Sequence, residues 1–279
     1  MTPGPAPTSA VIRPRIGVFD SGVGGLSVLR ALRAQLPDAQ MHYVADSGHA
    51  PYGERSDRHV LTRSRRIAAH LFDQGAQVLV IACNTATAVA AAALRDAWPG
   101  HPIVGVEPGL KPALALTRNG RIGVMATSAT LRSDKFRRLL DTHARGHSVL
   151  LQACPGLAAA IERGQLDDPR LLALIDRFTR PLREAGVDTV VLGCTHYPFV
   201  RDAIQAALGR EVQVVDTADA VARHTVTRLL GEAAERTETG PLAPSRTVLQ
   251  TSGDVTLLRR IAAHWLDFPT DVAALPPGV

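Results

Sequence analysis

Eight short aliphatic runs, each followed by a turn and then by an alanine- and leucine-rich stretch, organise most of this 279-residue chain. Short apolar runs that alternate with amphipathic helical stretches are typical of βα units on a parallel sheet. The runs form two sets of four expected strands: 15–20, 41–46, 77–83 and 102–107, then 121–127, 148–154, 188–194 and 212–217. The sequence therefore predicts an α/β fold.

The two sets of strands resemble one another in residues as well as in order. RIGV begins the first strand at Arg15 and recurs at Arg121, and the third strands end in Cys83 and Cys194 at nearly the same spacing. We therefore expect two lobes. Residues 15–106 with 217–279 would form the first lobe and 107–216 the second, because the chain after the polar loop 231–247 is expected to return to the first half. Residues 1–14 are expected to be a disordered tail.

Composition narrows the class of protein. Hydrophobic residues make up 46% and charged residues 20%, which is ordinary for a soluble globular protein. No apolar run approaches the roughly 20 residues of a membrane-spanning helix, and the N-terminal stretch lacks the regions of a signal peptide. Three cysteines without framework spacing indicate a reducing compartment. We expect a cytoplasmic protein with no membrane contact.

Positive charge is the second compositional feature. A net charge of +5 and a pI near 9.6 permit weak association with nucleic acid. The positive residues are scattered, however, and the densest cluster, RSDRHVLTRSRR at 55–66, has no interleaved aromatics. That cluster predicts a solvated helix face, and no nucleic-acid partner is expected.

Short polar residues follow both strand-end cysteines: Asn84 and Thr85 after Cys83, and Thr195 and His196 after Cys194. Ligands of open parallel sheets bind beyond the carboxyl ends of the strands, so both cysteines should line a cleft between the lobes. Free N–H groups at a helix N-terminus favour an anion and lower a thiol pKa from about 8.5. A thiolate there could act as a base.

Two other interpretations of the cysteines stay open. A free cysteine is commonly a small buried hydrophobe, which is the interpretation we favour for Cys154, since a proline follows it. A zinc site could combine Cys83, Cys194 and His196, but close C-x-x-C pairing and an evident fourth ligand are missing. We expect no metal.

The loop DSGVGGLS at 20–27 suggests a rival function. Gly22, Gly24 and Ser27 nearly fit the dinucleotide fingerprint, and Asp46 ends the next strand where a ribose-binding acid would lie. The third glycine is absent, however, and Asp20 would place a carboxylate near the pyrophosphate. Alternatively, the glycines let the backbone approach a small ligand while Asp20 points into the cleft.

Seven stretches in fixed order, spanning roughly residues 15 to 268, carry a resemblance to a known family. They are GVFDSGVGGLSVL, YVADSGHAPYGERS, VIACNTATA, GVMATSATLRS, ACPGLAAAIERG, VLGCTHYPF and TSGD. Together they resemble the glutamate racemases of the cofactor-independent aspartate/glutamate racemase superfamily. His196 after the CT pair is similar to the glutamate branch, because aspartate racemases typically carry glutamate there.

The resemblance implies two flavodoxin-like parallel-sheet lobes, related by a pseudo-twofold axis, with glutamate in the cleft between them. It implies that Cys83 and Cys194 are the catalytic acid/bases, assisted by Asp20 and His196 respectively. Asp46 and Glu162 match acidic positions that support proton transfer. The ligand contacts that it implies are Asp20, Ser21, Tyr52, Gly53, Asn84, Thr85, Thr127, Thr130, Thr195 and His196.

It further implies no cofactor, a homodimer, and D-glutamate made for peptidoglycan synthesis. Ala126 stands where the family commonly has glycine, so the sequence does not fix the backbone conformation that leads to Thr127 and Thr130. Asp20 and Ser21 could instead cap the following helix, Tyr52 could be a buried ring in a turn, and His196 could be structural. A racemase for aspartate, a dinucleotide-dependent oxidoreductase and a non-catalytic glutamate-binding protein remain as alternatives.

Overall fold

The computed structural model describes residues 13–233 and 245–279. All but the last two residues of the predicted tail, and most of the predicted polar loop 231–247, lie outside the described residues. Within the described chain, no helix is both long and apolar enough to cross a membrane.

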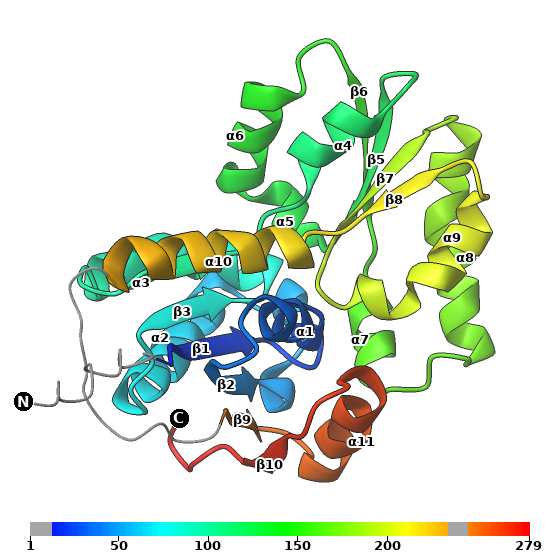
Figure 1. The fold of residues 1–279 in the computed structure, drawn as a ribbon. Helices are drawn as coiled ribbons and strands as arrows, with labels where there is room; N and C mark the ends of the chain where they lie inside the picture. The colour runs from blue at the N-terminus through cyan, green and yellow to red at the C-terminus, as the bar shows by residue number, and fades with distance from the viewer. Residues whose placement is uncertain (1–12, 234–244) are drawn as a thin grey trace, which may run out of the picture.

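The first sheet has six parallel strands in the order β10-β9-β2-β1-β3-β4 (Figure 1). Its strands are β1 (Arg15–Asp20), β2 (Gln40–Ala45), β3 (Val78–Ile81), β4 (Ile103–Gly105), β9 (Thr247–Thr251) and β10 (Asp271–Ala274). Its helices are α1 (Leu26–Gln35), α2 (Asp57–Asp73), α3 (Asn84–Ala97), α10 (Ala218–Ala233) and α11 (Val255–Trp265). Two short 3₁₀ turns, η1 (Ser47–His49) and η2 (Tyr52–Glu54), follow β2.

The second sheet has four parallel strands in the order β6-β5-β7-β8. They are β5 (Arg121–Ala126), β6 (Ser148–Ala153), β7 (Thr189–Gly193) and β8 (Gln213–Val215). Its helices are α4 (Leu110–Leu116), α5 (Ser128–Arg132), α6 (Asp134–His143), α7 (Leu157–Glu162), α8 (Pro169–Glu184) and α9 (Arg201–Leu208), with η3 (Tyr197–Val200) after β7. The predicted α/β class with two parallel-sheet lobes is confirmed.

The order β2-β1-β3-β4 in one sheet equals β6-β5-β7-β8 in the other, as the repeated residues predicted. The C-terminal part returns to the first sheet as expected, since β9 pairs with β2 along Met41 to Ala45. Neither β9 nor β10 is among the eight predicted strands. Buried and half-buried residues alternate along β9, and β10 is a short, largely exposed edge strand, so no continuous apolar run marks either one in the sequence.

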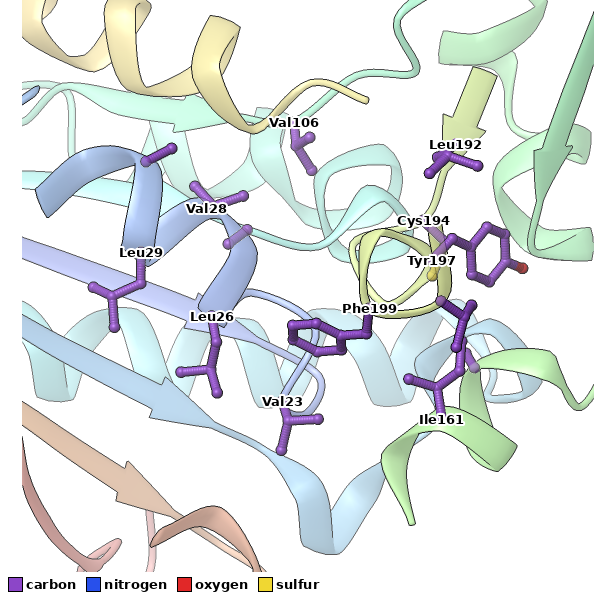
Figure 2. Close-up of a cluster of buried hydrophobic side chains, with 14 of the residues drawn as sticks. Val23, Leu26, Val28, Leu29, Val106, Ile161, Leu192, Cys194, Tyr197 and Phe199 are labelled. Atoms are coloured by element: carbon purple, nitrogen blue, oxygen red, sulfur yellow. The ribbon is translucent and has the colours of Figure 1, made fainter. Parts of the chain in front are cut away.

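Burial explains why the central strands formed where the aliphatic runs lie. All residues of β1 after Arg15, and all of β3 and β7, are buried, because helices cover both faces of each parallel sheet. One cluster of buried side chains continues from one lobe into the other. Figure 2 shows Val23 and Leu26 of the first lobe beside Phe199 and Ile161 of the second. This cluster holds the strand ends of the two lobes together.

Candidate active site

The two strand-end cysteines occupy equivalent positions in the two lobes. Cys83 lies two residues beyond β3 and is the N-cap of α3, where its sulfur accepts the Ala86 N–H at 3.4 Å. Cys194 follows β7 directly and precedes η3. Both side chains are buried, with 5% and 7% of their surface exposed.

A chain of hydrogen bonds links Cys83 to a carboxylate at the end of β1. The Cys83 thiol donates to Ser21 Oγ at 3.7 Å, and Ser21 Oγ donates to Asp20 Oδ1 at 3.0 Å. Asp20 therefore reaches the thiol through Ser21. The α1 N-cap is Gly25, with no side-chain cap, so neither Asp20 nor Ser21 caps that helix.

The predicted lowering of the thiol pKa is wrong for Cys83. Burial raises the pKa of Cys83 well above its ordinary value, and the nearby Asp20 charge raises it further. The hydrogen bonds that Cys83 makes with the Ala86 N–H and with Ser21 Oγ act to lower this pKa but do not outweigh these effects. Burial also raises the pKa of Asp20. Cys83 is therefore a thiol in the free protein.

A second chain of contacts links Cys194 to Glu162 through His196. His196 Nδ1 lies 3.8 Å from the Cys194 sulfur, and Nε2 lies 2.6 Å from Glu162 Oε2. Burial works against a charged ring, but the hydrogen bonds to Cys194 and Glu162 raise the pKa of His196 well above its ordinary value. Burial likewise acts to raise the pKa of Glu162, but the His196 hydrogen bond and charge hold that pKa below its ordinary value. A buried imidazolium therefore lies beside Cys194.

We call these two chains, Cys83–Ser21–Asp20 and Cys194–His196–Glu162, the thiol relays. Each relay also makes hydrogen bonds with the opposite lobe. Glu162 accepts the Val23 N–H at 3.0 Å and the Ser47 hydroxyl at 2.6 Å, both from the first lobe. Thr195 of the second lobe donates to Asp20 Oδ2 at 2.8 Å. Both thiol sites consequently depend on the lobes being held together.

Hydroxyl groups from both lobes form a cluster near the N-terminus of α3. Thr85 Oγ1 lies 3.1 Å from Thr127 Oγ1, which donates to Thr130 Oγ1 at 3.0 Å. Asn84 Nδ2 is buried and has no hydrogen-bond partner among the described residues. These groups can donate to a carboxylate. Ala126 ends β5, and Thr127 directly after it is the N-cap of α5, where it accepts the Thr130 N–H.

A family model described as Asp/Glu/Hydantoin racemase matches residues 16–225 of this chain. The chain belongs to the Asp/Glu/hydantoin racemase family. Relatives with known names include a glutamate racemase of Pseudomonas aeruginosa, 53% identical over 77% of this chain and 81% of its own length. Another, from Ectopseudomonas mendocina, is 49% identical over 88% of this chain and 92% of its own.

Solved structures agree with this family assignment. A glutamate racemase isoform of Bacillus anthracis superimposes with a TM-score of 0.83, at 33% identity and over 95% of this chain and 98% of that one. The Escherichia coli glutamate racemase in complex with L-glutamate and the activator UDP-MurNAc-Ala gives 0.81, at 30% identity, over 95% of this chain and 100% of that one. The resemblance found in the sequence is confirmed.

Two glycines of the DSGVGG loop, Gly22 and Gly24, allow close contact between the lobes of this racemase. A Cβ atom on Gly22 would lie 2.3 Å from Glu162 Oε2, and one on Gly24 would lie 2.4 Å from His196 Nδ1. Second-lobe side chains thus occupy the space that a pyrophosphate would need. Asp46, the expected ribose ligand, is bonded instead to Arg63, Tyr52 and Ser252. The dinucleotide interpretation is wrong.

Gly22→Ala is expected to lower turnover about tenfold or more, because the added methyl displaces Glu162 from His196 and so weakens the Cys194 relay. The φ angle of Gly22 is not positive, so the substitution adds no backbone strain of its own. Gly100→Ala is the control, since its Cβ meets nothing within 4 Å. Turnover and melting temperature of both variants would be measured. Equal turnover in the two variants would contradict a role for the close contact between Gly22 and Glu162.

The structure adds three residues that the sequence reasoning missed: Ser47, Arg63 and Ser252. Ser47 bonds to Glu162, and the other two bond to Asp46. A signal for Arg63 existed, because it falls on the apolar stripe of α2 between Val60 and Ile67, where an arginine is unusual. Ser47 and Ser252 have no such signal, since a single serine in a loop is ordinary.

Proposed function

We propose that this enzyme, an isomerase that interconverts L-glutamate and D-glutamate, moves the α-proton with the Cys83 and Cys194 thiols and uses no cofactor. The observation that carries the proposal is the pair of buried relays, one to Asp20 and one to Glu162, at equivalent strand ends of two lobes. Relatives that share about half their residues with this chain are named glutamate racemases, which supports glutamate as the substrate.

The α-proton of glutamate is a very weak acid, so proton removal and delivery must be closely coupled. With the two sulfurs on opposite faces of the α-carbon, one takes the proton as the other delivers one, and a free carbanion never diffuses away. Burial raises the pKa of Cys83 and keeps it a thiol, which makes it a proton donor, and the His196 ring lies 3.8 Å from the Cys194 sulfur. Cys194 then accepts the α-proton of one enantiomer and Cys83 protonates the other face. The opposite enantiomer requires the opposite protonation.

Binding of the two substrate carboxylates is assigned to the short donors at the strand ends. The unpartnered Asn84 amide and the hydroxyls of Thr85, Thr127 and Thr130 suit one or both carboxylates. Such preplaced donors stabilise charge that moves onto the carboxylate as the proton leaves. The remaining assigned contacts are Asp20, Ser21, Tyr52, Gly53, Thr195 and His196.

The oligomeric state, the location and the use of the product are proposed from the family resemblance. By this proposal the enzyme is a homodimer in the cytoplasm, and its D-glutamate is used in peptidoglycan synthesis. The lobe boundaries, 15–106 with 217–279 and 107–216, are part of the same proposal. No metal is assigned, because both proton carriers are side chains of this chain.

Racemisation of L-glutamate in heavy water tests the two-thiol mechanism. Early D-glutamate should carry deuterium at the α-carbon while the remaining L-glutamate is still mostly protiated, because the removed proton stays on one sulfur and the delivered one comes from the other. The measurement is mass spectrometry of the separated enantiomers at low conversion, with L-aspartate as a parallel substrate. Substantial unlabelled D-glutamate would point to a single base that reaches both faces. Faster turnover of aspartate than of glutamate would overturn the proposal that glutamate is the substrate.

A further inference from the structure

Arg63 departs from the pattern of the basic cluster on α2. Its neighbours Arg58, Arg65 and Arg66 are exposed, as predicted for a solvated face, but Arg63 retains only 5% of its surface. The prediction of a solvated face is therefore wrong for this residue. A buried guanidinium is costly unless its donors are paired, so its partners indicate why it is there.

The Arg63 guanidinium is paired on three of its nitrogens. Nε donates to Asp46 Oδ2 at 2.9 Å and Nη2 donates to Asp46 Oδ1 at 2.7 Å, a bidentate arrangement. Nη1 donates to the main-chain oxygen of Val279 at 2.8 Å. Bidentate arginine–carboxylate pairs fix orientation as well as charge. Arg63 thus holds Asp46 in one position.

Asp46 has no acceptor capacity left for a substrate proton. Besides Arg63, Oδ2 accepts the Tyr52 hydroxyl at 2.6 Å and Oδ1 accepts the Ser252 hydroxyl at 2.7 Å. Burial acts to raise the pKa of Asp46, but the bonds from Arg63 and Tyr52 hold it below its ordinary value. The geometry suits an anchor rather than the proton-transfer support that the family resemblance implied.

The anchored segment, residues 46–55, is one of the parts of the first lobe that contact the second lobe beside the thiols. Ser47 donates to Glu162 at 2.6 Å, and a Cβ on Gly53 would lie 2.9 Å from Thr127 Cβ. At its start, the Asp46 N–H donates to the Asp20 carbonyl at 3.0 Å. We call residues 46–55 the bridging segment. Its position determines where Tyr52 and Gly53 lie relative to the second lobe.

We propose that Arg63 is a positioning residue of the active site, which acts through Asp46 and Tyr52 to hold the bridging segment where it contacts the substrate. The kinetic part of its test rests on the proposed racemisation of glutamate, whereas the structural part does not. Arg63 itself touches neither thiol relay among the described hydrogen bonds.

The test compares Arg63→Met with Arg66→Met, an exposed arginine of the same helix. Arg63→Met should raise KM for L-glutamate about tenfold, with kcat changed less than about threefold, because the variant disturbs binding contacts and leaves the thiols in place. Arg66→Met should match the wild type. Arg63→Lys, which keeps the charge but loses the bidentate geometry, should fall between them.

Coupling to Asp46 is tested with Asp46→Asn and the double variant. If Arg63 acts through Asp46, the double variant should be no worse in kcat/KM than the poorer single variant. Additive losses would overturn the proposal. A fall in kcat in both directions, with both KM values unchanged, would also overturn it and return Asp46 to proton transfer.

Hydrogen–deuterium exchange of the unliganded protein supplies a readout that needs no activity. Backbone amides of residues 46–55 should exchange faster in Arg63→Met than in Arg66→Met, with other strand-end loops unchanged. Unchanged exchange there would overturn the proposal even if KM rises. If Arg63→Met does not fold, Arg63→Lys, which keeps the charge but loses the bidentate pair with Asp46, takes its place in both measurements. A wild type that fails to racemise glutamate would sink the proposed function, and exchange would still decide the role of Arg63.

Discussion

Cys83→Ala and Cys194→Ala are each expected to reduce racemisation by more than about 10³-fold in both directions, because a two-base reaction stops when either proton carrier is missing. Cys154→Ala should keep turnover within about threefold. Cys154 is equally buried, but its sulfur donates to the Gln152 carbonyl at 3.4 Å, outside both chains of contacts that end at the other two thiols. Burial raises the pKa of Cys154 to about 12, so it stays a thiol at any working pH.

Polarimetry with each enantiomer measures these three variants, and thermal unfolding shows whether they fold. Cys154→Ala serves as the matched control, since it removes a buried thiol from the same molecule without touching a relay. Equal losses in all three would mean that a buried thiol is needed for folding. Retained turnover in Cys194→Ala would contradict the two-thiol mechanism.

His196→Asn is expected to lower kcat about 10²-fold in one direction and less in the other, because His196 supports Cys194 and not Cys83. Asp20→Asn should show the opposite preference, since Asp20 serves Cys83 through Ser21. The equilibrium constant is close to one, so the two kcat/KM values must stay nearly equal in every variant. Progress curves from each enantiomer measure both parameters. Equal falls of kcat in both directions would contradict a directional role.

The pH dependence of stability tests the charge assigned to His196. Because its pKa is raised on folding, its contribution to the free energy of unfolding is fully present below its ordinary value of 6.5 and is lost as pH rises through the higher folded pKa. For Glu162, whose pKa is lowered, the contribution is present above its ordinary value of 4.5 and is lost as pH falls through the folded pKa. The melting temperature of the wild type should exceed that of His196→Asn by the largest margin between these values, and the margin should shrink in alkali.

The local sequence pattern was sufficient to predict most strands of the two sheets and the position of the two thiols at strand ends. Each of the eight predicted strands overlaps an observed one. The central strands β1, β3 and β7 are short apolar runs because they are buried on both faces. The relation between Cys83 and Cys194 followed from equal strand order, which repeats in both sheets. Strands β9 and β10 were missed because neither is a continuous apolar run: β9 alternates buried and half-buried residues, and β10 is an exposed edge strand.

What the sequence by itself determined is the set of elements, the two lobes and the residue types at the strand ends, since these depend on periodicity and chain order. The tertiary structure alone decided the partners: Glu162 with His196, Ser21 between Cys83 and Asp20, and Arg63 with Asp46. It also decided that Cys83 has a raised pKa where a helix N-terminus predicted a lowered one. The physical reason is that burial and charge pairing depend on what the opposite lobe brings within hydrogen-bonding distance, and residues far apart in the chain leave no local signal of that distance.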